Sequence, residues 1–62
     1  MANTLAYHET LELHELVAFA SNALVGLKMK VRDVPNQELK NLYLTTIKVL
    51  ERYIKELLQY FP

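Results

Sequence analysis

Both histidines and three of the seven acidic residues lie within one short stretch near the start of the chain, His8-Glu9-Thr10-Leu11-Glu12-Leu13-His14-Glu15. On a helix, His8 and Glu12 are one turn apart and Glu12 and Glu15 are three positions apart, so these three side chains share one edge. Imidazole nitrogens and carboxylate oxygens on a common edge are ligands for a divalent metal ion. His8, Glu12 and Glu15 are therefore the candidate metal ligands, whereas His14 points to another side.

A second interpretation of this stretch is a solvated acidic helix start, whose histidines cap, pack or hydrogen-bond to neighbouring groups. Di-iron carboxylate bundles require Glu-x-x-His on two helices and a further glutamate from each of the others. No Glu-x-x-His occurs in this sequence, and we favour the solvated start. Glu9 falls near the apolar side of the helix, where we expect it to reach solvent or to pair with a Lys, an Arg or Tyr60.

Nucleophilic and phosphate-binding chemistry find little support in the sequence. The one serine, Ser21, is two helical turns from the nearer histidine, His14, which is about 10 Å along the axis. The chain has one glycine and no cysteine, too few for a glycine-rich phosphate loop or a thiolate site. Two long helices with an alternating core provide no evident substrate pocket. We expect no enzyme and no cofactor.

Two long helices must position these side chains. Only one place, Asp33-Val34-Pro35-Asn36, breaks the helical periodicity. Apolar residues recur at steps of three and four from Leu13 to Val31 and again from Leu39 to Phe61. Acidic side chains lie in the first turns of the upstream helix and basic ones at its end, which suits the helix dipole. The pattern predicts an all-α fold, a long antiparallel helical hairpin.

The predicted helix ends follow from capping residues and proline. The expected organisation is a single domain, 1–62, with a helix over about 5–31, a turn over about 32–35 and a helix over about 35–60. Asn3 or Thr4 is the expected N-cap of the first helix. The second helix is expected to begin near Pro35, whose fixed φ suits the first helical position. Gly26 lies inside the first helix, where we expect it to permit a close helix crossing.

The charge balance excludes several partners. Seven basic and seven acidic residues give a formal net charge of zero, so we expect no nucleic acid partner. Lys28, Lys30 and Arg32 are explained as a solvated helix end, and Glu51 and Lys55 as an exposed ion pair one turn apart. No apolar run is long enough to cross a bilayer, and we expect no membrane partner. Without the pattern of a signal peptide, cytoplasmic synthesis is expected.

The two helices carry more apolar faces than a lone hairpin can bury. The first helix has a second apolar stripe about 140 to 180° from its inner seam. We call this the outer stripe; it consists of Tyr7, Leu11, Ala18, Val25 and Met29. The apolar arc of the second helix covers about half of its circumference, wider than on an ordinary surface helix. We therefore predict a homodimer in which two hairpins form a four-helix bundle. The positions predicted to form the core and dimer interface are Leu11, Leu13, Leu16, Ala20, Leu24, Leu27, Leu42, Ile47, Leu50, Ile54 and Leu57.

The pattern also resembles a known family. The segment His8-Glu9-x-x-Glu12-Leu13-His14-Glu15-Leu16 is its most distinctive part, and Glu38-Leu39-Lys40 and Glu56-Leu57-Leu58 extend the similarity over nearly the whole chain. These residues resemble the small proteins related to bacterial spore coat protein F. The resemblance implies a ferritin-like helical architecture, production in endospore-forming bacteria, location in the spore coat and other spore coat proteins as partners.

Two functions follow as hypotheses. The first is a non-enzymatic structural or assembly protein that acts through helix–helix association and resembles spore coat proteins. The alternative is a metal-binding ferritin-like module that uses the N-terminal cluster of histidines and glutamates. Elemental analysis of the purified protein distinguishes the two.

Overall fold

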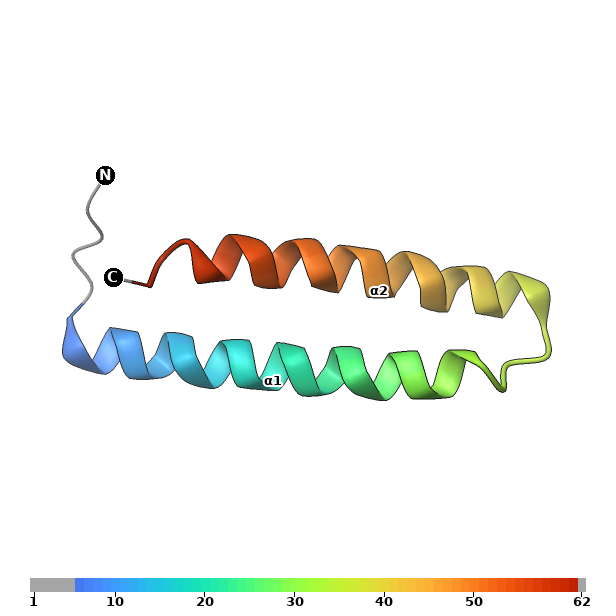
Figure 1. Cartoon of the computed structure of the whole chain (residues 1–62), viewed down its shortest axis with the longest axis horizontal. Helices are drawn as coiled ribbons and strands as arrows, with labels where there is room; N and C mark the ends of the chain where they lie inside the picture. Colours follow the sequence, from blue (N-terminus) through green and yellow to red (C-terminus); the bar gives the residue numbers. More distant parts are fainter. Residues whose placement is uncertain (1–5, 62) are drawn as a thin grey trace.

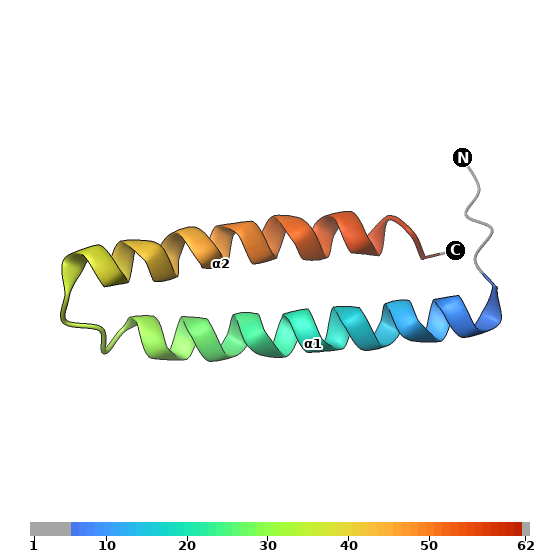
Figure 2. The ribbon, with the colours of Figure 1, turned by 180° about the vertical axis from the view of Figure 1, so that it is seen from behind.

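The chain folds into one pair of antiparallel helices. The computed structural model describes residues 6–61, in which α1 spans Tyr7–Val31 and α2 spans Gln37–Leu58. The two helices lie side by side along their whole length, and both ends of the described chain are at the same end of the hairpin (Figures 1 and 2). The principal dimensions are 45 × 19 × 10 Å, so the molecule is a single layer about one helix thick. The predicted all-α hairpin is confirmed.

The N-terminus of α1 is capped by a hydrogen bond to a side chain of its own first turn. Its N-cap is Ala6, whose backbone N–H donates to Oε1 of Glu9 over 2.9 Å. This bond satisfies one backbone donor that the helix leaves free, as in the second half of a capping box. Asn3 and Thr4, which the sequence predicted as caps, lie outside the described residues.

The second helix begins two residues later than predicted. Pro35 precedes the helix, and Asn36 is the N-cap, with its Oδ1 accepting from the backbone N–H of Leu39 over 2.9 Å. The correction has a simple cause: a capping side chain must lie outside the helix, and asparagine is among the strongest N-cap residues. The helix also ends earlier than predicted, at Leu58, because Tyr60 N–H turns back to the carbonyl of Leu57.

The helices pack through one seam that repeats every three and four residues. Ala20, Ile47 and Leu57 are the buried hydrophobic residues, with exposed fractions of 3%, 7% and 9%. The seam is completed by half-buried side chains, which are Thr10, Leu13, Val17, Leu24, Leu27 and Val31 of α1 and Tyr43, Leu50, Ile54 and Phe61 on the α2 side. Alternating steps of three and four keep the seam of each helix facing the other, as in coiled coils.

Three residues predicted for the core and dimer interface stay on the surface of the hairpin. Leu11, Leu16 and Leu42 are exposed, whereas the other eight predicted residues are buried or half-buried. Gly26 is not at a close helix crossing within the hairpin, because a Cβ at this position would meet nothing within 4 Å. The crossing of α1 and α2 does not require a glycine there.

Candidate functional site

The N-terminal cluster of histidines and glutamates lies on the first three turns of α1, and two of its members have local structural roles. Glu9 caps the helix through Ala6, as described above. The ring of His14 packs edge-on against Phe61, with centroids 4.5 Å apart and planes 66° apart. Its Nδ1 lies 2.9 Å from the carbonyl oxygen of Thr10; since a carbonyl only accepts, this nitrogen carries the hydrogen. His14 therefore fastens the segment after α2 to the beginning of α1.

The predicted metal ligands are not gathered into a three-ligand group. His8, Glu12 and Glu15 are all exposed on α1. Within residues 6–61, no set of three or more His, Cys, Asp or Glu side chains is arranged to hold a metal ion. The shared helix edge is present, but one exposed edge of one helix does not surround an ion. The alternative function thus receives no geometric support from the single chain.

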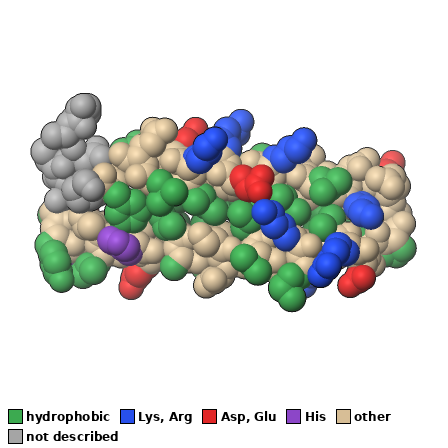
Figure 3. Space-filling view, in the orientation of Figure 1, with side chains coloured by type: hydrophobic (Ala, Val, Ile, Leu, Met, Phe, Trp, Pro, Cys, Tyr) green, Lys and Arg blue, Asp and Glu red, His purple; other side chains and the backbone are tan. Residues whose placement is uncertain are grey.

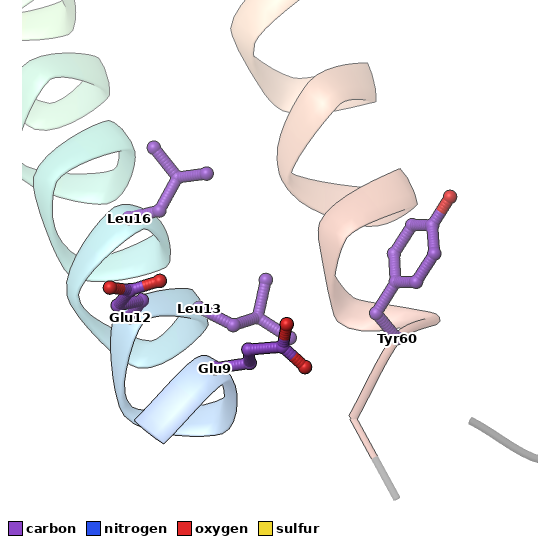
Figure 4. Close-up of a pocket in the computed structure, with 5 residues that line it drawn as sticks. All are labelled: Glu9, Glu12, Leu13, Leu16 and Tyr60. Atoms are coloured by element: carbon purple, nitrogen blue, oxygen red, sulfur yellow. The ribbon is translucent and has the colours of Figure 1, made fainter. Parts of the chain in front are cut away.

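Two shallow apolar grooves lie between the helices. The first has a volume of about 280 Å³ and is lined by Glu9, Glu12, Leu13, Leu16 and Tyr60. Leu13, Leu16 and Glu9 point from α1 toward α2, and Tyr60 forms the far side (Figure 4). Glu9 and Tyr60 line the same groove, but the Tyr60 hydroxyl points away from α1 (Figure 4), and the hydrogen bond that the Glu9 carboxylate makes is to Ala6.

The second groove lies nearer to the turn of the hairpin. It has a volume of about 180 Å³ and is lined by Leu27, Leu39, Leu42, Tyr43 and Thr46. Its apolar lining offers no charged group for catalysis. Both grooves are open depressions in a surface, and they provide shape for packing another apolar surface.

The groove residues outside the seam all lie on one side of the hairpin. On α1, Leu16 lies one position before the seam residue Val17, and on α2, Leu42 and Tyr60 lie one position before Tyr43 and Phe61. In two antiparallel helices, positions that precede the seam by one residue lie on the same side of the hairpin. We call this side the apolar face after its apolar members, which are Leu16, Phe19, Ala23 and Gly26 of α1 and Leu39, Leu42, Val49, Tyr53 and Tyr60 of α2. Glu9, Glu12 and Lys30 of α1 and Thr46 and Glu56 of α2 precede the seam in the same way and lie on the same side.

Large side chains on the apolar face are unusually open to solvent. Phe19 is 73% exposed, Leu42 64% and Tyr60 54%. Leu39, Val49 and Tyr53 are each more than 40% exposed. Single apolar residues are normal on protein surfaces, whereas several large ones along the same side of two neighbouring helices are typical of an interaction site.

The opposite side of the hairpin carries charged side chains of both signs together with exposed apolar ones, Leu11, Val25, Leu44 and Leu58, each of which follows a seam residue by one position. Lys28 and Glu51 each follow a seam residue by one position, and their side chains form a salt bridge across the two helices, with Nζ and Oε2 3.0 Å apart. Figure 3 views the molecule from this side, where charged side chains of both signs are spread over the helices and hydrophobic side chains fill the groove between them. We call this side the charged face.

The pairing of Glu51 differs from the prediction. The sequence predicted an ion pair with Lys55 one turn along α2, but Glu51 reaches Lys28 on the other helix. The periodicity of one helix shows only its own neighbours, whereas the partner across the hairpin depends on how far the helices are shifted along each other.

The surface area and the radius of gyration are those of an elongated molecule. The accessible surface is 5082 Å², whereas a compact monomeric protein of this mass exposes about 4,100 Å². The radius of gyration is 14.6 Å, against about 11 Å for a compact domain of this length.

Comparisons with known proteins identify no relative: no protein family, curated protein or solved structure matches this chain. Within residues 6–61, neither helix is long and apolar enough to span a lipid bilayer.

Proposed function

We propose that this chain is a non-enzymatic structural or assembly protein that acts through helix–helix association. Its basic unit is a homodimer in which two hairpins join through their apolar faces into a four-helix bundle. The observation that carries this proposal is the strip of open, large apolar side chains on one face, led by Phe19 and Leu42. Closing that face against a second copy converts two single-layer hairpins into a two-layer structure with a shared core.

The second helix supports this choice of face with its residue spacing. Leu39, Leu42, Thr46, Val49, Tyr53, Glu56 and Tyr60 follow alternating steps of three and four. The seam against α1 has the same spacing one position further on, at Tyr43, Ile47, Leu50, Ile54, Leu57 and Phe61. A helix with two adjacent seams of this kind contacts two neighbours, as each helix does in a four-helix bundle.

The resemblance to spore coat protein F gives this assembly role a setting. The segment that carries most of this resemblance, His8 to Leu16, contains Glu9, which caps α1, and His14, whose ring contacts Phe61. It ends with Leu16 of the apolar face. The proposal therefore includes residence in the spore coat of an endospore-forming bacterium. Immunoblotting should detect the protein on purified spores; its presence in vegetative cells and absence from spores would contradict this part of the proposal.

Sedimentation equilibrium tests the homodimer. We expect twice the chain mass at micromolar concentration, and a melting temperature that rises with protein concentration because association stabilises the folded chains. A folded single chain that melts cooperatively and independently of concentration would overturn the proposal.

Two leucines of α2 provide a matched pair of variants. Leu42 lies on the apolar face and is 64% exposed, whereas Leu44 is 43% exposed and lies two turns before Glu51, on the charged face. Leu42→Lys should dissociate the dimer, because it places a charge in the shared core. Leu44→Lys changes the same residue type in the same helix and should leave the dimer intact. Equal effects of the two variants would show that the apolar face is not the interface.

A further inference from the structure

We infer that the two hairpins of the dimer run in opposite directions, so that each α1 packs along the partner's α1. In this arrangement the two-fold axis is perpendicular to the helices, Leu16 packs against the partner's Gly26, and Phe19 packs against the partner's Ala23. The inference rests on the proposed homodimer and adds the orientation of its two copies and the contacts that fix it.

The spacing on the apolar face of α1 is symmetric about its centre. Glu12, Leu16, Phe19, Ala23, Gly26 and Lys30 are separated by steps of four, three, four, three and four. This series is the same when read from either end, so an antiparallel copy brings every position opposite a member of the same series. On α2, the series Leu42, Thr46, Val49, Tyr53, Glu56 and Tyr60 has the same property.

The sizes of the side chains are complementary in that register. Leu16 and Phe19 are large and lie toward the N-terminal half of α1, whereas Ala23 and Gly26 are small and lie toward its C-terminal half. Reversing one copy places each large side chain opposite a small one, which is how layers of a helical core interdigitate.

Gly26 gives this register independent support. A glycine within a helix destabilises it by about 1 kcal/mol relative to alanine. A Cβ at Gly26 would meet nothing within 4 Å in the hairpin, so the single chain gives no steric reason for the missing side chain. The partner's Leu16, seated over this position, supplies that reason.

The charges at the two ends of the apolar face also select the antiparallel orientation. Glu12 stands at one end of the α1 series and Lys30 at the other, and the register that pairs Leu16 with the partner's Gly26 pairs Glu12 with the partner's Lys30. With parallel copies, the acidic ends of both hairpins, which carry Glu9, Glu12 and Glu56, would lie together. Such opposition of like charges is unfavourable, and it is the kind of contact that fixes helix orientation.

Distance measurements between spin labels test the orientation directly. The chain has no cysteine, so a single cysteine reports one position in each copy. Asn41→Cys places a label near the turn of the hairpin, and Arg52→Cys places one near the middle of α2; both side chains are exposed and lie away from the apolar face. Antiparallel copies separate the two Asn41 labels by about 30 Å along the bundle axis, and the two Arg52 labels by far less. Equal separations for both variants would establish parallel copies and overturn the inference.

Two sets of variants test the register. Gly26→Ala should raise the dimer dissociation constant by about tenfold, because the added methyl group overfills the contact with the partner's Leu16. Helix propensity acting alone would instead strengthen the folded chain, so an unchanged or lower dissociation constant overturns the contact. Glu12→Lys and Lys30→Glu should each weaken the dimer, and the doubly substituted chain should regain most of its affinity; no recovery would also overturn it.

The outcomes separate this inference from the proposed function. A dimer with parallel copies, or one that Gly26→Ala tightens, overturns the antiparallel register and leaves the homodimer standing. A chain that remains single at all concentrations overturns both.

Discussion

Nζ of Lys28 in α1 lies 3.0 Å from Oε2 of Glu51 in α2, so one ion pair spans the charged face. The two side chains are 53% and 48% exposed, and exposed pairs contribute less than about 1 kcal/mol because water and salt screen them. We expect Glu51→Gln to lower the free energy of unfolding in urea by no more than that amount. Charge reversal at both positions should restore the original stability, and a much larger loss would show that the pair is shielded from solvent.

The cap of α2 makes a larger local contribution. Oδ1 of Asn36 accepts from the N–H of Leu39, and loss of such a cap costs about 1 kcal/mol. We expect Asn36→Ala to lower the free energy of unfolding by about this amount, measured by circular dichroism in urea at fixed protein concentration. Asn36→Asp keeps an acceptor and should be nearly neutral. If both substitutions were equally costly, the capping bond would not be the cause.

Truncation of the buried seam residue Ile47 should lower stability far more than truncation of its exposed neighbour Lys48. Ile47 is 7% exposed, and removal of a buried isoleucine side chain to alanine costs about 2–5 kcal/mol. Lys48, the next residue, is exposed, and Lys48→Ala should change stability by no more than about 0.5 kcal/mol. Thermal unfolding of both variants at one concentration checks the assignment, which fails if their melting temperatures are alike.

The contact between His14 and Phe61 can be observed in the magnetic resonance signals of the histidine rings. His14 packs edge-on against Phe61 at 4.5 Å, so the aromatic ring shifts the magnetic resonances of the imidazole. Phe61→Ala should move the ring-proton signals of His14 and leave those of His8, the internal control, unchanged. The stability loss should be about 1 kcal/mol beyond the lost apolar burial. Unmoved His14 signals would contradict the contact.

Metal titration tests the alternative function. We expect elemental analysis of protein purified without chelator to find no stoichiometric metal. We also expect zinc, manganese or iron to leave the melting temperature unchanged, since an ion that binds only the folded state must raise it. A rise that Glu12→Gln abolishes would establish a metal site at His8, Glu12 and Glu15.

The fold could be predicted from the spacing of apolar residues, because that spacing indicates which side of each helix is apolar. The seam residues Leu24, Leu27, Leu50 and Ile54 are half-buried as their spacing indicated. The helix ends depend on competing local hydrogen bonds. The sequence predicted that the second helix begins near Pro35, but the cap at Asn36 places its first residue at Gln37. Element boundaries are set by such single hydrogen bonds, which periodicity does not contain.

The site was less accessible to sequence reasoning because it depends on how the helices lie against each other. The excess of apolar surface was evident from composition and spacing, and the exposed residues of the outer stripe agree with it. Leu16 and Leu42 of the apolar face were among the predicted core and interface residues, but Phe19, Ala23 and Gly26 were not. Phe19 and Gly26 could have extended it, because a large aromatic residue and a glycine seven positions apart fall on the same side of a helix. The antiparallel shift of α2 then decides which of its residues join them.

The outer stripe remains uncovered when the apolar faces close. Tyr7 is 81% exposed, Met29 60% and Val25 56%, and none of the three belongs to the apolar face. A two-fold dimer would therefore expose two equivalent apolar stripes. Dimers that associate through both stripes would form filaments or layers rather than an assembly of fixed size. Warm buffers rich in sulfate should promote that growth, since both conditions strengthen contacts between apolar surfaces.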